Sequence, residues 1–125
     1  MRRRNLLWLL TAATAGFFVG FLVFRRQGPL PSKDEINRTL NELAIALHQG
    51  RPLLHAIERA ANKTTHPRLK KAWSDVLNLV SQGRSLSKAM SVHRDIFPNE
   101  LILAIQKGEI EGNVDIVLLN YTARH

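Results

Sequence analysis

Apolar residues recur at helical spacing through most of the chain after residue 32. A first stripe is formed by Ile36, Leu40, Leu43, Ala44 and Leu47. A second stripe follows Pro52, which suits the first turn of a helix, and is formed by Leu53, Leu54, Ile57, Ala60 and Ala61. Spacings of three and four residues place such side chains on one face of an amphipathic helix. The capping box Ser32-Lys33-Asp34-Glu35 predicts where the first helix begins.

The helical pattern continues in the middle of the chain. Pro67 suits the first turn of a third helix. Its expected inward face is formed by Leu69, Ala72, Trp73, Val76, Leu77 and Val80. Ser85 is expected to cap a short fourth helix, which carries Leu86, Ala89 and Met90.

Two further helices are predicted after a loop at 92–96 that Phe97-Pro98 anchors. The fifth helix is expected from Asn99 to Gly108, and the sixth opens at Gly112 or Asn113 and runs through Leu118, Leu119 and Tyr121. The apolar run 101–105 is also compatible with a buried strand, but the helices predicted on both sides favour a helix. We therefore expect an all-α domain, an antiparallel bundle of about six helices in three helical hairpins.

A short repeat marks the predicted corners between these helices. Gln49-Gly50-Arg51-Pro52-Leu53-Leu54-His55-Ala56-Ile57 returns 33 residues later as Gln82-Gly83-Arg84-Ser85-Leu86-Ser87-Lys88-Ala89-Met90. A weaker third copy starts at Gly112. This pattern is typical of a helix that stops at a left-handed glycine before a second helix starts at once. The 33-residue offset also fits a tetratricopeptide-like solenoid, although Trp73 is not repeated as such solenoids require.

The chain opens with a segment that could cross a membrane. Leu6–Phe24 holds 19 residues without a charge, and a helix of that length spans roughly 28 Å, close to the hydrocarbon core of a bilayer. A cleaved signal peptide is the rival interpretation, but the run is long and lacks a small-x-small cleavage site. Ala12, Gly16 and Gly20 share one helix face, where they either admit a second transmembrane helix or reflect ordinary composition.

The expected organisation is therefore a transmembrane anchor with basic flanks at 1–26, a Pro/Gly linker at 27–32 and a helical domain at 33–125. The membrane orientation stays open, because basic residues flank both sides of the apolar segment. Arg2, Arg3 and Arg4 precede it, whereas Arg25, Arg26, Lys33 and Arg38 follow it. The positive-inside rule therefore predicts neither orientation clearly.

A net charge of +8 would favour nucleic-acid binding, but the distribution of the charged residues along the chain weakens that interpretation. Five of the positive charges flank the apolar segment, and residues 27–125 hold 13 Lys and Arg against 10 Asp and Glu. The only aromatic residues in that part are Trp73, Phe97 and Tyr121. A basic surface with interleaved aromatic residues is not indicated, so we expect no nucleic-acid partner.

No enzyme chemistry is indicated by the sequence. The chain has no Cys, and its histidines lack the spacing and acidic neighbour of a His-Glu-x-x-His zinc site. It has neither a phosphate-binding loop nor a Gly-x-Ser-x-Gly elbow. We therefore expect a non-enzyme with no metal and no cofactor.

Two charged clusters are open to two interpretations each. Glu109, Glu111 and Asp115 lie around the last corner. They either interact favourably with the positive N-terminal end of the last helix's dipole or contact a partner. Lys63, Arg68, Lys70 and Lys71 lie around the second and third helices. They are either a solvated helix face or a surface for an acidic partner or anionic lipid headgroups.

The combined motifs resemble the F-domain of type II secretion inner-membrane proteins, which is shared with the type IV pilus platform protein PilC and competence-system relatives. The matching positions are Leu43, Gly50, Pro52, Leu53, Ala56, Gly83, Ser85, Leu86, Ser87, Ala89, Phe97, Pro98, Gly108, Glu109, Gly112 and Leu118. The resemblance covers residues 33–125.

This resemblance implies a non-catalytic platform in the bacterial inner membrane that couples a cytoplasmic assembly ATPase to pilin-like subunits. It also implies homo- or hetero-oligomers and no cofactor. It further implies a cytoplasmic helical domain, which would place Arg2–Arg4 on the opposite, periplasmic side of the membrane. Family members usually carry two such domains and about three membrane spans, whereas one of each is predicted here. A single-domain, split or truncated member is therefore expected. The alternative function is a membrane-tethered helical adaptor unrelated to secretion.

Overall fold

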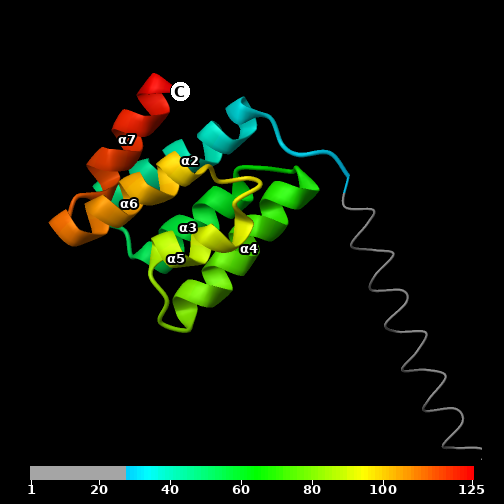
Figure 1. Ribbon diagram of the computed structural model, residues 1–125. Coiled ribbons are helices and arrows are strands. Elements are labelled where there is room, and N and C mark those ends of the chain that lie inside the picture. Colours follow the sequence, from blue (N-terminus) through cyan, green and yellow to red (C-terminus); the bar gives the residue numbers. More distant parts are fainter. Residues whose placement is uncertain (1–27) are drawn as a thin grey trace, which may run out of the picture.

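The computed structural model describes residues 28–125, which form six α-helices, one 3-10 turn and no strand (Figure 1). The elements are α2 (Lys33–His48), α3 (Leu53–Asn62), α4 (Pro67–Ser81), α5 (Leu86–Met90), η1 (Ser91–His93), α6 (Asn99–Glu111) and α7 (Val114–Arg124). The prediction of an all-α domain with about six helices is confirmed for this part of the chain. The proposed anchor at 1–26, with Ala12, Gly16 and Gly20, lies outside the described residues. Among the residues that are described, no helix has the length and apolarity to cross a bilayer.

The helices pack as a closed ring rather than as an open stack. Each of α2 to α6 contacts the next helix along the chain, and α7 returns to pack against α2. Figure 1 shows α7 lying beside α6 and α2 at one edge of the bundle. In a solenoid each repeat contacts only its neighbours along the chain. The contact between α2 and α7 therefore argues against the solenoid interpretation of the 33-residue offset.

One hydrophobic core lies inside this ring. Trp73 of α4 is fully buried and meets Phe97 in an edge-to-face contact with ring centroids 5.0 Å apart. Such a pair adds about 0.5–1.5 kcal/mol beyond the burial of its area. The other large and fully buried side chains are Leu40, Leu43, Ile57, Leu69, Val76, Leu86, Met90, Leu101, Ile105 and Leu118. Every helix from α2 to α7 thus contributes to the same core.

The first two corners have the predicted glycine geometry. Gly50 has φ +80° and Gly83 has φ +98°, both in the left-handed region. The N–H of Arg51 donates to the carbonyl of Ala46 at 3.0 Å, and the N–H of Arg84 donates to that of Leu79 at 3.1 Å. These bonds satisfy carbonyls that the helix end would otherwise leave unpaired. The repeated sequence therefore encodes a repeated helix ending.

The prediction that Gly108 ends the fifth helix is wrong. Helix α6 continues to Glu111, and Gly112 with φ +76° supplies the left-handed residue instead. Gly108 lies inside α6 and is buried against α7, where a Cβ built on it would lie 3.1 Å from the Cα of Val114. Its lack of a side chain permits this close approach of the two helices. The third corner therefore follows the weaker repeat copy that begins at Gly112.

Several smaller expectations can be compared with the helix ends and faces. The capping box is confirmed, because the N–H of Glu35 donates to Ser32 Oγ and the N–H of Ser32 donates to the Glu35 carboxylate. Ser85 caps α5 as predicted. The inward assignment of Leu54 is wrong, since its side chain is 41% exposed and Ala56 takes part in the buried face. Pro52 precedes α3 as its N-cap residue instead of lying in its first turn.

Candidate docking surface

The corner between α6 and α7 brings together the acidic residues that the sequence singled out. Gly112 turns the chain back, so Glu109 and Glu111 at the end of α6 and Asp115 at the start of α7 lie on the two sides of one turn. Two apolar side chains accompany them, because Ile110 is 82% exposed and Ile116 is 42% exposed. We call Glu109, Ile110, Glu111, Asp115 and Ile116 the α6–α7 corner.

The carboxylates of Glu109 and Glu111 differ from Asp115 in their surroundings. Within residues 28–125, neither glutamate forms an ion pair or a side-chain hydrogen bond. Ile110 between them is the most exposed of the large apolar side chains described. An exposed isoleucine flanked by two unpaired carboxylates suits a partner with an apolar side chain and basic neighbours.

Asp115 is already engaged inside the domain. Its carboxylate lies 3.0 Å from Nδ1 of His48, the last residue of α2. The hydrogen bond with His48 holds the pKa of Asp115 below its ordinary value of 3.8, assisted by the backbone N–H of Ile116 and opposed by partial burial. The pair joins the first corner to the third. No local sequence pattern predicts this contact, because 67 residues separate the two side chains.

The residues that carry the resemblance lie at the corners and in the core. Gly50, Gly83 and Gly112 form the three left-handed helix endings. Pro52 and Pro98 precede α3 and α6 as N-cap residues. Ala56, Leu86, Ala89, Phe97 and Gly108 are buried, and Leu53 is partly buried against the core. These positions shape the bundle, whereas Glu109 is the motif residue with a carboxylate at the exposed α6–α7 corner.

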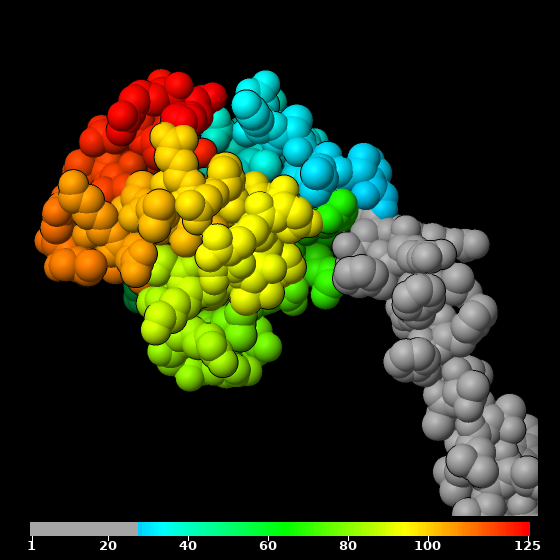
Figure 2. Space-filling view, viewed as in Figure 1, coloured from blue at the N-terminus to red at the C-terminus, as the bar shows by residue number. Residues whose placement is uncertain are grey.

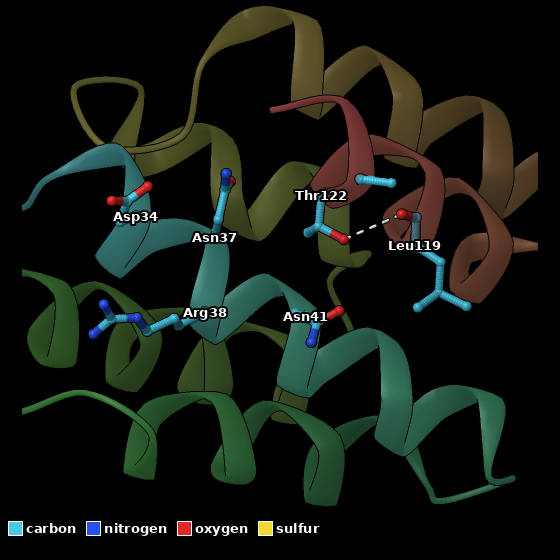
Figure 3. Close-up of a pocket in the computed structure, with 7 residues that line it drawn as sticks. Asp34, Asn37, Arg38, Asn41, Leu119 and Thr122 are labelled. Carbon is cyan, nitrogen blue, oxygen red and sulfur yellow. Dashed lines mark hydrogen bonds between the residues drawn. The ribbon is translucent and has the colours of Figure 1, made fainter.

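A shallow groove of about 580 Å³ runs between α2 and α7 (Figure 3). Asp34, Asn37, Arg38 and Asn41 line it from α2, and Thr122 faces them from α7 with its hydroxyl bonded to the carbonyl of Leu119 at 3.1 Å. Two asparagines, a threonine, one carboxylate and one guanidinium offer no nucleophile activated by a base. The groove therefore provides polar contacts but no evident reaction centre.

Three of the five histidines in residues 28–125, His48, His93 and His125, each lie beside a single acidic partner. His93 lies 2.9 Å from Asp75, and His125 lies 3.6 Å from Glu100. Across residues 28–125, no three His, Cys, Asp or Glu side chains converge as metal ligands. These pairs instead connect η1 to α4 and the end of α7 to the start of α6.

Comparison with known proteins identifies one family. The family described as type II secretion system (T2SS), protein F, matches residues 39–125, which is well over half of the chain. The match includes all three corners and most of α2. Among curated proteins, none matches the chain.

Proposed function

The chain belongs to the family of type II secretion system protein F, and we propose that it is a non-catalytic platform component of a type II secretion or type IV pilus-like assembly machine. In this proposal the protein resides in the bacterial inner membrane. Its helical domain docks the cytoplasmic assembly ATPase or neighbouring subunits of the machine. The domain acts by holding its partner proteins in fixed relative positions rather than by catalysing a reaction.

The composition of the α6–α7 corner is the observation that supports docking. Ile110 exposes 82% of its surface between two carboxylates that have no partner within residues 28–125. Figure 2 shows this corner, coloured orange, on the opposite side of the domain from residues 28–31. A partner can therefore reach the corner without obstruction from the linker.

The anchor is part of the same proposal. The apolar segment Leu6–Phe24 holds the domain at the membrane as a single span, and the domain faces the cytoplasm. A reporter fused after Arg124 tests this orientation. Cytoplasmic reporter activity supports docking to an ATPase, whereas strong periplasmic activity contradicts it, because the domain and the ATPase would then lie on opposite sides of the membrane.

Docking is tested by co-purification with the assembly ATPase from membranes. We expect a variant carrying Glu109→Gln, Ile110→Ala and Glu111→Gln to lose at least about tenfold in recovered ATPase, because truncating an exposed anchor residue and its charged neighbours at an interface costs roughly 1–3 kcal/mol. The matched control carries Leu54→Ala and Glu58→Gln, an exposed apolar residue and an exposed carboxylate on α3. Equal losses in both variants would contradict a specific role of the α6–α7 corner.

A further inference from the structure

Residues 60–74, which we call the α3–α4 connection, comprise the end of α3, the turn after it and the first half of α4. They form a basic segment without a neutralising acid in its sequence. Residues 60–74 contain Lys63, Arg68, Lys70 and Lys71 and no Asp or Glu. Lys63, Lys70 and Lys71 are exposed. In the described chain, Lys63 and Lys70 have no acidic partner, and Lys71 has only a distant one, Asp75 at 3.7 Å. Lys63 and Lys70 therefore keep their charge available for a ligand, and Lys71 shares its charge with Asp75 on a solvent-exposed face of α4.

Arg68, the fourth basic residue, fastens the linker to this same connection. Its guanidinium forms an ion pair with Asp95 and donates a hydrogen bond from Nη1 to the carbonyl oxygen of Gly28 at 3.3 Å. Arg68 is thus held between α4, the loop before α6 and the start of the described chain. Figure 2 shows the green surface of the α3–α4 connection beside the blue start of the domain.

Chain length then limits how far this connection can lie from the apolar segment. Phe24 is the last residue of that segment, and four residue steps separate it from Gly28. Four extended residues span at most about 14 Å, and a headgroup layer is roughly 5–7 Å thick. If Leu6–Phe24 is inserted, Gly28 must lie at or just beyond the headgroups, and the hydrogen bond from Arg68 to Gly28 keeps the α3–α4 connection near the lipid surface.

We propose that Lys63, Lys70 and Lys71 bind the phosphate groups of anionic lipids, so that the α3–α4 connection is a second point of membrane contact. The inference rests on the membrane anchor in the proposed function. It adds an orientation, in which the α3–α4 connection faces the membrane and the α6–α7 corner points away from it. Each lysine near an anionic surface contributes roughly a fivefold gain in association at moderate salt.

Because the chain has no native Cys, single labelling sites can be introduced in the full-length protein. Thr65→Cys places an environment-sensitive fluorophore on the α3–α4 connection, and Gln82→Cys places one at the second corner as a control; both positions are exposed. The labelled proteins are reconstituted in nanodiscs of phosphatidylcholine alone or of phosphatidylcholine mixed with phosphatidylglycerol. Quenching by headgroup-attached quenchers then reports contact with the lipid surface.

We expect strong quenching at position 65 in the anionic discs, weak quenching in phosphatidylcholine and little quenching at position 82 in either. A Lys63→Gln, Lys70→Gln, Lys71→Gln variant should lower the ratio of docked to free domain by roughly a hundredfold. A variant with Arg51→Gln, Arg84→Gln and Lys88→Gln removes the same charge from the corners and should behave like the parent. High salt should also abolish the contact, because the Debye length falls from about 10 Å at 0.1 M to about 3 Å at 1 M.

Four results would overturn the inference. Quenching at position 65 that does not depend on phosphatidylglycerol would exclude recognition of anionic headgroups. An equal loss of lipid contact in the two triple variants would show that the effect depends on net charge and not on the position of the lysines. Failure of the chain to enter the discs would remove both the anchor and this inference, whereas insertion without quenching at position 65 would contradict the inference alone and leave the proposed docking of the ATPase intact.

Discussion

At the residue scale, three glycines determine where helices end. Gly50, Gly83 and Gly112 have φ between +76° and +98°, and a Cβ built on any of them would meet no atom within 4 Å. Space is therefore available for a side chain at each position, but the backbone conformation is unfavourable for L-residues other than glycine. The cost of replacing such a glycine is conformational rather than steric.

Gly83→Ala should lower the free energy of unfolding by about 1 kcal/mol or more, because alanine is strained at this positive φ. Thermal unfolding followed by circular dichroism measures the effect. Gln82→Ala is the matched control, since residue 82 lies in the same corner at φ −86° and tolerates a side chain. A melting temperature unchanged by Gly83→Ala would contradict the left-handed helix ending.

The pair of His48 and Asp115 should make a small contribution to stability that depends on pH. The folded state holds the pKa of Asp115 below 3.8, so this contribution is present above pH 3.8 and is lost as the pH falls through the lowered folded-state pKa. Since both side chains are partly exposed, Asp115→Asn should cost no more than about 1 kcal/mol at neutral pH.

The measurement for this pair is the difference in melting temperature between parent and Asp115→Asn, taken at neutral pH and again in acid. The difference should shrink in acid, and His48→Ala should reproduce the neutral-pH loss. Glu111→Gln serves as the control, because Glu111 has no ion pair within residues 28–125. A difference that is the same at both pH values would exclude the ionised carboxylate of Asp115 as its source.

At the scale of elements, the contact between α6 and α7 depends on Gly108. In an exposed helix, Gly→Ala would stabilise by about 1 kcal/mol. Here the new Cβ would lie 3.1 Å from the Cα of Val114 and 3.1 Å from Cγ2 of Val117. A backbone atom on one side and a branched side chain on the other leave little room for local adjustment.

Gly108→Ala should therefore destabilise the domain, by about 1–3 kcal/mol, because overpacking outweighs the gain in helix propensity. Gln106→Ala, at an exposed position of the same helix, is the control for propensity alone and should be neutral or slightly stabilising. Chemical unfolding curves of the two variants give the comparison. A more stable Gly108→Ala variant would show that α7 can move away without cost.

At the scale of the whole molecule, successive helices run in opposite directions. The connections between them therefore lie at two opposite ends of the bundle. The pair of His48 and Asp115 joins the first and third corners at one end. At the other end, Arg68 holds Gly28 and Asp95, and His125 approaches Glu100. The linker thus emerges at the end opposite the α6–α7 corner (Figure 1). In our proposals, the end that carries the linker faces the membrane and the α6–α7 corner at the opposite end meets a partner.

Local signals made much of the architecture predictable from the sequence. The capping box at Ser32, the cap at Ser85 and Pro67 at the start of α4 each act within a few residues. The repeated Gln-Gly-Arg corners were equally readable, because their hydrogen bonds close over six residues or fewer. These local features, together with helical periodicity, determined the fold class and the resemblance to the family that the comparison identified.

Contacts between distant segments required the tertiary structure. Helix α6 ends at Gly112 and not at Gly108, because Gly108 packs against α7. Leu54 is exposed because another face of α3 packs against the neighbouring helices. The 67 residues between His48 and Asp115, and the 40 between Gly28 and Arg68, carry no signal that pairs them. A residue's local sequence determines its helix, whereas its partners across the bundle depend on how several helices share one core. That packing closed α7 onto α2 and set the α6–α7 corner opposite the linker.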